Sequence, residues 1–311
     1  MINKLFTDQL KNFTSSLDTF INFYINKKLP QTLLLTGEKG IGKLNFAYHF
    51  VNYVFSQHDE KHYNLKSYKT NKDSKTYNLL SQNSHPNCLL ISPLENKKNI
   101  EITQTQKIQE YLNKSSFNKI PKIIIINGSE FLNISSSNCL LKTLETKYDN
   151  VYFFLIQNSK NYILPTIKSR CIEFKFILRK NERENRINEI LNMKYNELNS
   201  DFKNKYLSPL FFQDFIKYCE NNNLEIKKIN LNDLLINIFS NQNYKQNEFL
   251  HDHFLLIIQL FFYNLIINNK NDEKYFLLLK YFTKRFDDVK KYNLDFESYL
   301  IEFKHVVFNE K

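Results

Sequence analysis

The 311-residue sequence has few glycines, cysteines and prolines (4, 4 and 6) and no tryptophan. No two cysteines form a C-x-x-C pair and no histidine cluster lies beside them, so we expect neither a disulfide framework nor a metal site. We interpret each cysteine as a small buried apolar side chain in a reducing cytosol. The four are Cys88, Cys139, Cys171 and Cys219.

Long apolar segments are also missing. The longest, Phe254 to Ile267, is interrupted by Gln259 and Asn264 and is too short to span a bilayer. Met1 to Phe13 is polar and lacks the apolar region of a secretory signal. We therefore expect a cytoplasmic protein with no membrane contact.

The charge of the chain is strongly positive, at +11. Such a charge is compatible with a nucleic-acid partner. However, lysines are scattered through every segment, and the abundance of Lys, Asn, Ile and Phe is typical of an AT-biased genome. Composition therefore gives little functional information, and DNA binding stays an alternative.

Three of the four glycines lie within one octet, Gly37-Glu38-Lys39-Gly40-Ile41-Gly42-Lys43-Leu44. Its residues fit the phosphate-binding pattern G-x-x-x-x-G-K-[ST] everywhere except at Leu44. In such a loop the glycines let backbone N–H groups point at phosphate, and the lysine reaches the terminal phosphates. We therefore predict that Gly37, Gly40, Gly42 and Lys43 form a degenerate P-loop.

Leu44 replaces the hydroxyl that would hold magnesium in an active P-loop ATPase. The turn after a second predicted strand has also lost groups that would bind the metal and activate water. The apolar run Ile123–Ile126 ends in Asn127 and Gly128, where such ATPases carry a metal-binding Asp and a Glu that polarises water. Glu130 is interpreted as a helix or loop carboxylate rather than a displaced base. Together these changes predict a catalytically silent site without a metal.

Buried strands and helices alternate over residues 1–176, which predicts a doubly wound α/β domain around a parallel sheet. The expected strands are Thr32–Thr36, Cys88–Ile91, Lys122–Ile126, Val151–Ile156 and Ile172–Phe176. The expected helices between them are Lys43–Phe55, Thr103–Asn113 and Ser137–Tyr148.

Two further regions complete the expected organisation. Gln57–Ser84 shows no apolar periodicity and is predicted to be an exposed insertion. Beyond Phe176 only helical patterns occur, which we divide into a small helical domain at 177–231 and a helical bundle at 232–311. The later helices are expected at Asn181–Met193, Leu210–Glu220, Asn232–Phe239, Phe249–Ile267, Glu273–Phe286 and Phe296–Phe308.

Two motifs follow the altered corner: Asn138-Cys139-Leu140-Leu141-Lys142-Thr143-Leu144-Glu145 and, later, Ser169-Arg170-Cys171. With the P-loop, the His85-Pro86-Asn87 turn and Leu29-Pro30, they resemble the bacterial clamp-loader subunits of DNA polymerase III, which belong to the AAA+ class. The resemblance covers residues 1–176. Within the family, the losses of metal and base groups resemble the delta-prime type.

The resemblance implies a role for individual residues. Arg170 would act as an arginine finger that reaches the ATP site of a neighbouring motor subunit in trans. The alternative is that Arg170 is an ordinary surface arginine after a turn, with no functional role. Asn158 would match the sensor on the fourth strand or simply cap that strand. Residues 177–231 and 232–311 would form the lid and the oligomerising collar.

The resemblance also implies cofactors and partners. At most weak ATP or ADP binding without hydrolysis is expected. The cysteine zinc module of the family is absent from Gln57–Ser84, where His58 and His62 lack partners, so no zinc is expected. The partners would be homologous motor subunits and a delta-like subunit in a hetero-oligomer, with the sliding clamp and primed DNA reached through it. The alternatives are an ATP-hydrolysing motor subunit of the same family and a basic DNA-binding protein.

Overall fold

The structure is a computed structural model that describes residues 7–94, 97, 99–114, 120–159, 161–204, 207–240, 248–268, 273–292 and 294–308. Its contacts divide the chain into two compact units, Met1–Arg179 and Lys180–Lys311. Each unit is described by itself.

The first unit is built around a five-stranded parallel sheet in the order β2-β3-β4-β1-β5. Strands β1, β3 and β4 are buried almost throughout, as expected for strands that are covered on both faces. The predicted α/β fold is therefore confirmed. The strands are β1 (Thr32–Gly37), β2 (Cys88–Ile91), β3 (Lys122–Asn127), β4 (Val151–Asn158) and β5 (Ile172–Lys175).

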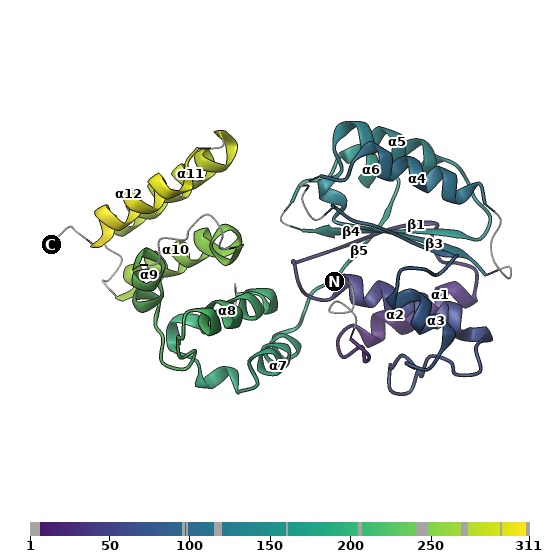
Figure 1. Cartoon of the computed structure of the whole chain (residues 1–311), viewed down its shortest axis with the longest axis horizontal. Helices are drawn as coiled ribbons and strands as arrows, with labels where there is room; N and C mark the ends of the chain where they lie inside the picture. The colour runs from purple at the N-terminus through teal and green to yellow at the C-terminus, as the bar shows by residue number, and fades with distance from the viewer. Residues whose placement is uncertain are drawn as a thin grey trace. The chain divides into compact units, whose positions relative to one another are not determined.

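Helices cover both faces of this sheet (Figure 1). Because side chains alternate along a strand, Ile123 and Ile125 join one apolar cluster while Ile124 and Ile126 join the other. The first cluster is covered by α1 (Thr14–Ile25), α2 (Lys43–Phe55) and α3 (Lys75–Ser81). The second is covered by α4 (Ile102–Leu112), α5 (Ile134–Glu145) and α6 (Pro165–Lys168).

Residues 57–84 differ from the exposed insertion that we predicted. They contain the 3-10 helix η2 (Ser56–His58) in part and the whole of α3, and they bury Tyr63 and Leu80 in the cluster around α2. The two buried side chains are 17 positions apart in the sequence, so no local periodicity reveals them. The insertion is therefore partly a covering layer of the α/β unit.

The second unit is entirely helical within the described residues. One apolar cluster runs through it from Ile187 to Phe303 and is rich in phenylalanine. The expected boundary near 232 falls inside this unit, and the lid and collar assignments stay predictions. Its helices are α7 (Lys180–Leu191), α8 (Pro209–Asn221), α9 (Leu231–Ser240), α10 (Glu248–Asn268), α11 (Glu273–Tyr292) and α12 (Phe296–Phe308).

No helix in the described part of the chain is both long and apolar enough to cross a membrane.

Candidate functional site

The predicted P-loop connects β1 to α2 and depends on its glycines in two ways. Gly40 and Gly42 have φ of 83° and 103°, in the left-handed region that side chains with a Cβ rarely adopt. Gly37 is required by space instead, because a Cβ there would lie 2.6 Å from the carbonyl oxygen of Phe176. In a chain with few glycines, the three in this loop are therefore retained because the backbone here requires them.

Lys43 is the first residue of α2, and its side chain folds back onto the loop. Its Nζ donates hydrogen bonds to the carbonyl oxygens of Gly37, at 2.7 Å, and Glu38, at 2.6 Å. Burial lowers the pKa of Lys43 to about 8, while the charges of Glu130 and Glu38 act in the opposite direction. A phosphate in the loop would therefore have to compete with two backbone acceptors for this ammonium group.

Leu44, the residue after the lysine, has an apolar side chain and packs against other apolar side chains. Leu44 is half-buried and packs against the cluster beneath the sheet. Its side chain offers no oxygen ligand to a cation.

The carboxyl end of β3 forms the neighbouring corner. Asn127 ends the strand and pairs with Ile156 of β4, and Gly128 follows with φ of 83°. A Cβ at Gly128 would lie 2.6 Å from the ring of Phe131. The positive φ and the contact with the Phe131 ring both favour glycine at this position.

Glu130 lies in the 3-10 helix η4 (Ser129–Phe131) and is directed to the end of β4. Both carboxylate oxygens accept from the backbone N–H of Asn158 at 3.3 Å, and one also accepts from Nδ2 of Asn161 at 3.5 Å. This agrees with a loop carboxylate. Asn158 itself pairs with Gly37 in the register of β4 and β1, so it lies beside the P-loop at the same edge of the sheet.

Arg170 lies elsewhere. It follows α6 and precedes β5, whose first residue, Ile172, pairs with Leu33 near the start of β1. The P-loop begins at Gly37, four residues further along β1 than Leu33, which corresponds to about 13 Å at ~3.3 Å per residue. The structure therefore groups Gly37, Lys43 and Asn158 at the carboxyl ends of the parallel strands and places Arg170 at the amino ends.

The side chain of Arg170 is about one-third exposed, and its guanidinium has several partners. Nη1 donates to the carbonyl oxygen of Thr166 at 2.9 Å and to the hydroxyl of Ser169 at 3.4 Å. Nη2 forms an ion pair with Glu145, the last residue of α5. Glu145 lies within the motif Asn138–Glu145, but a separation of 25 residues gives no sequence signal for its contact with Arg170.

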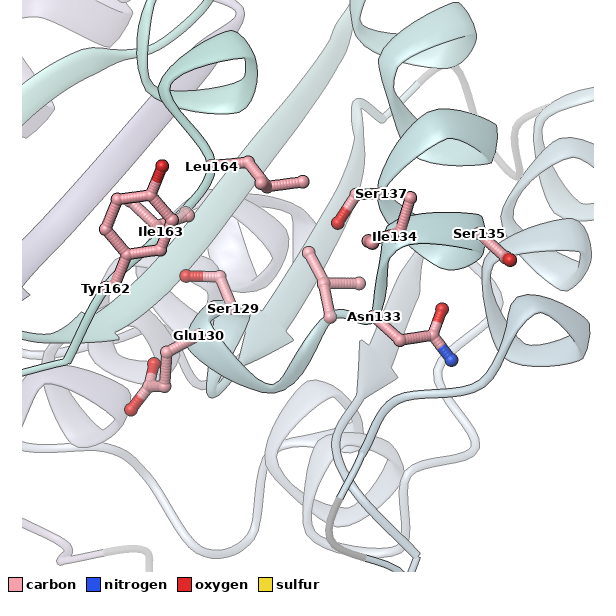
Figure 2. Close-up of a pocket in the computed structure, with 10 residues that line it drawn as sticks. Ser129, Glu130, Asn133, Ile134, Ser135, Ser137, Tyr162, Ile163 and Leu164 are labelled. Atoms are coloured by element: carbon pink, nitrogen blue, oxygen red, sulfur yellow. The ribbon is translucent and has the colours of Figure 1, made fainter. Parts of the chain in front are cut away.

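A pocket that the sequence did not predict lies between η4, the start of α5 and the segment after β4. Figure 2 shows Glu130 and Tyr162 on one side and the first residues of α5 on the other. Its volume is about 480 Å³, and it includes the fully buried hydroxyl of Ser137, which has no hydrogen-bond partner in the described structure. None of the predicted site residues lines it. Ser129, Leu132, Asn133, Ile134, Ser135, Ile163 and Leu164 complete the lining.

The four cysteines are free. Cys219 is fully buried as expected, whereas Cys88, Cys139 and Cys171 are half-buried. Burial raises the thiol pKa of Cys88, Cys171 and Cys219 to about 12, so these thiols stay protonated at neutral pH.

A parallel sheet in this strand order, with a P-loop between β1 and α2, defines a P-loop domain of the AAA+ type. The family described as "DNA polymerase III, delta subunit" matches residues 14–179, just over half of the 311-residue chain. The chain therefore belongs to this family.

Individual relatives agree with this membership. The chain is 28% identical over 140 residues to "DNA polymerase III subunit delta'" of Pseudomonas aeruginosa, which covers 45% of this chain and 41% of that relative. It is 37% identical over 93 residues to the protein of the same name from Haemophilus influenzae, covering 30% and 28%. The matches thus span less than half the length of these relatives.

Among solved structures, a "DNA polymerase III, gamma subunit-related protein" from Thermotoga maritima aligns with 19% identity and a TM-score of 0.45. The alignment covers 92% of this chain and 96% of that structure. At this TM-score the similarity carries no further conclusion.

Proposed function

We propose that this chain is a non-hydrolysing, delta-prime-like stator subunit of the DNA polymerase III clamp loader, which offers Arg170 to the ATP site of a neighbouring motor subunit. It would support sliding-clamp loading in DNA replication as part of a hetero-oligomer. Its direct partners would be homologous motor subunits and a delta-like subunit, and it would reach the sliding clamp and primed DNA through the complex.

The observation that carries the proposal is the loss of oxygen ligands at two separate corners. Leu44 presents methyl groups where a hydroxyl would hold magnesium, and Asn127 is neutral where a carboxylate would balance the metal charge. Gly128 cannot carry a base without a clash against Phe131. A phosphoanhydride bound here would therefore meet neither an organised metal nor an activated water.

The position of Arg170 supports action in trans. It lies at the opposite end of the strands from its own P-loop, and its head group is partly exposed. A guanidinium placed on a neighbour's γ-phosphate stabilises charge in the transition state, and such fingers accelerate hydrolysis by ~10³–10⁵-fold.

Nucleotide binding at the chain's own loop would be weak. The glycines keep the shape of a phosphate cradle, but Lys43 already donates to two carbonyl groups of the loop. ATP or ADP would gain little from the lysine, so we expect at most weak binding without hydrolysis.

The test is ATP turnover by the purified chain alone and by the reconstituted assembly. We expect no steady turnover by the isolated chain and a large loss in the assembly when Arg170 is replaced by alanine. Steady turnover by the isolated chain that Lys43→Ala abolishes would establish the motor alternative instead. Strong, salt-dependent duplex binding by the isolated chain would favour the DNA-binding alternative.

A further inference from the structure

Arg170 has acceptors in two parts of the first unit, the turn at the end of α6 and the end of α5. The turn after α6 is held by the N–H of Arg170 on the carbonyl of Ile167, at 3.1 Å, and Ile167 is fully buried. Thr166 and Ser169 hold Nη1 from within this turn. The only contact of the guanidinium with a separate element, among the residues that the structure describes, is Glu145.

Glu145 is itself well anchored. It is the last residue of α5, and the preceding residue, Leu144, is buried against the sheet together with Leu140. The following residue, Thr146, accepts a hydrogen bond through its carbonyl from the side chain of Gln31 at 3.0 Å. The end of α5 that carries the carboxylate is therefore anchored, and the side chain of Glu145 itself is about half exposed.

These contacts leave part of the guanidinium available. Nη1 uses its two N–H groups on Thr166 and Ser169, and Nη2 uses one on Glu145. Nε and the second N–H of Nη2 can still donate to an incoming anion, since arginine carries five N–H donors in one plane. A partly exposed ion pair is weak, so Glu145 can hold the head group in one orientation without preventing a phosphate from binding.

We propose that Glu145 is a positioning residue for Arg170: its carboxylate holds the guanidinium in the conformation that presents Nε and Nη2 to a phosphate of the partner subunit. This inference rests on the proposed function. A long arginine side chain loses conformational freedom when it binds, and a group already held in the right geometry loses less.

The experiment measures kcat and KM for ATP in the reconstituted assembly that contains this chain. We expect Glu145→Gln to lower kcat by roughly 3- to 10-fold, in the lower part of the range of coupling between contacting residues because the pair is partly exposed, with KM unchanged. Glu145→Asp keeps the charge and should recover part of the loss. In an Arg170→Ala background, Glu145→Gln should have no further effect, because there is no guanidinium left to orient.

Glu110→Gln is the matched control, because Glu110 is an exposed glutamate of the neighbouring helix α4. Thermal unfolding and co-elution with the partner subunits establish that each variant folds and assembles. The positioning role would be overturned if Arg170→Ala lowers turnover but Glu145→Gln does not. It would also be overturned if Glu145→Gln lowers turnover by the same factor with and without Arg170. A rise with Glu145→Gln would overturn it too, since the carboxylate would then restrain the arginine. Turnover unchanged by Arg170→Ala would overturn the proposed function itself.

Discussion

The two ends of the parallel strands carry basic side chains in opposite situations. At the carboxyl ends Lys43 is buried and bonds to its own loop, and the residues around it provide no metal-binding hydroxyl or carboxylate at Leu44 and Asn127. At the amino ends Arg170 is partly exposed and supported by three acceptors. Under the proposed function, this difference means that the sheet keeps the backbone of a phosphate site at one end while the cation that acts on phosphate lies at the other end.

The largest expected effect comes from removing the arginine at the amino ends of the strands. Arg170→Ala should lower ATP turnover at the partner site of the reconstituted assembly by ~10³-fold or more, the lower range for an arginine finger. Lys168→Ala removes a neighbouring charge that pairs with Glu173 at 3.1 Å and should have a small effect. Single-turnover hydrolysis by the assembly measures both, and equal losses would show that charge density, not Arg170, matters.

The second effect concerns stability and tests whether the turn after β3 requires glycine. Gly128→Ala should lower the free energy of unfolding by about 1–3 kcal/mol, because the alanine would have to keep φ at 83° with its Cβ against the ring of Phe131. Urea denaturation followed by circular dichroism measures the change in the first unit.

Gly42→Ala separates the two causes of this loss. Gly42 also has positive φ, but no atom beyond its local backbone and chain neighbours lies within 4 Å of a Cβ built there. Its substitution should therefore cost less than Gly128→Ala. Equal costs would mean that the contact with Phe131 contributes nothing and that a larger side chain could be tolerated at this corner.

Much of the first unit could be predicted because its signals are local. The five apolar runs became the five strands, and the glycines of the P-loop stood out in a chain that has only four. The expectation that all five strands are buried on both faces was wrong for β2 and β5, which are the outer strands of the sheet and only partly buried. Helix α5 begins at Ile134 rather than at Ser137, because Asn133 accepts the N–H of Ser136 and starts the helix one turn earlier. That capping signal was present in the sequence and was missed.

Other features depend on contacts between distant residues. Helix α1 buries Leu17, Phe20 and Ile21 at helical spacing, which could have been recognised. By contrast, three features follow from the folded geometry and have no sequence pattern. They are the Glu145–Arg170 pair, the hydrogen bonds from Lys43 to its own loop and the burial of Tyr63. Candidate site residues could thus be chosen from motifs, but not their partners.

The last expected effect is a dependence of stability on pH, and it concerns the layer that packs against the P-loop helix α2. His49 of α2 is fully buried: its Nε2 lies 2.9 Å from the carbonyl of Thr7 and its Nδ1 lies 2.8 Å from the hydroxyl of Tyr63. A neutral ring that donates through Nε2 and accepts at Nδ1 satisfies both contacts. Burial lowers the pKa of His49 to about 4, although Thr7 and Asp8 favour the charged form.

The unfolded chain binds this proton near pH 6.5, above the folded value, so the unfolded state gains protons first as the pH falls. Stability is therefore complete above about pH 6.5 and declines toward pH 4, by at most ~1.4 kcal/mol per pH unit for one histidine. Thermal unfolding of the first unit between pH 7 and 5 should show this decline, and His49→Gln should reduce its slope. His305→Gln, at an exposed histidine of α12, is the matched substitution. An equal reduction in both variants would contradict a specific role for His49, and the layer beneath the P-loop would then be no more sensitive to pH than the rest of the chain.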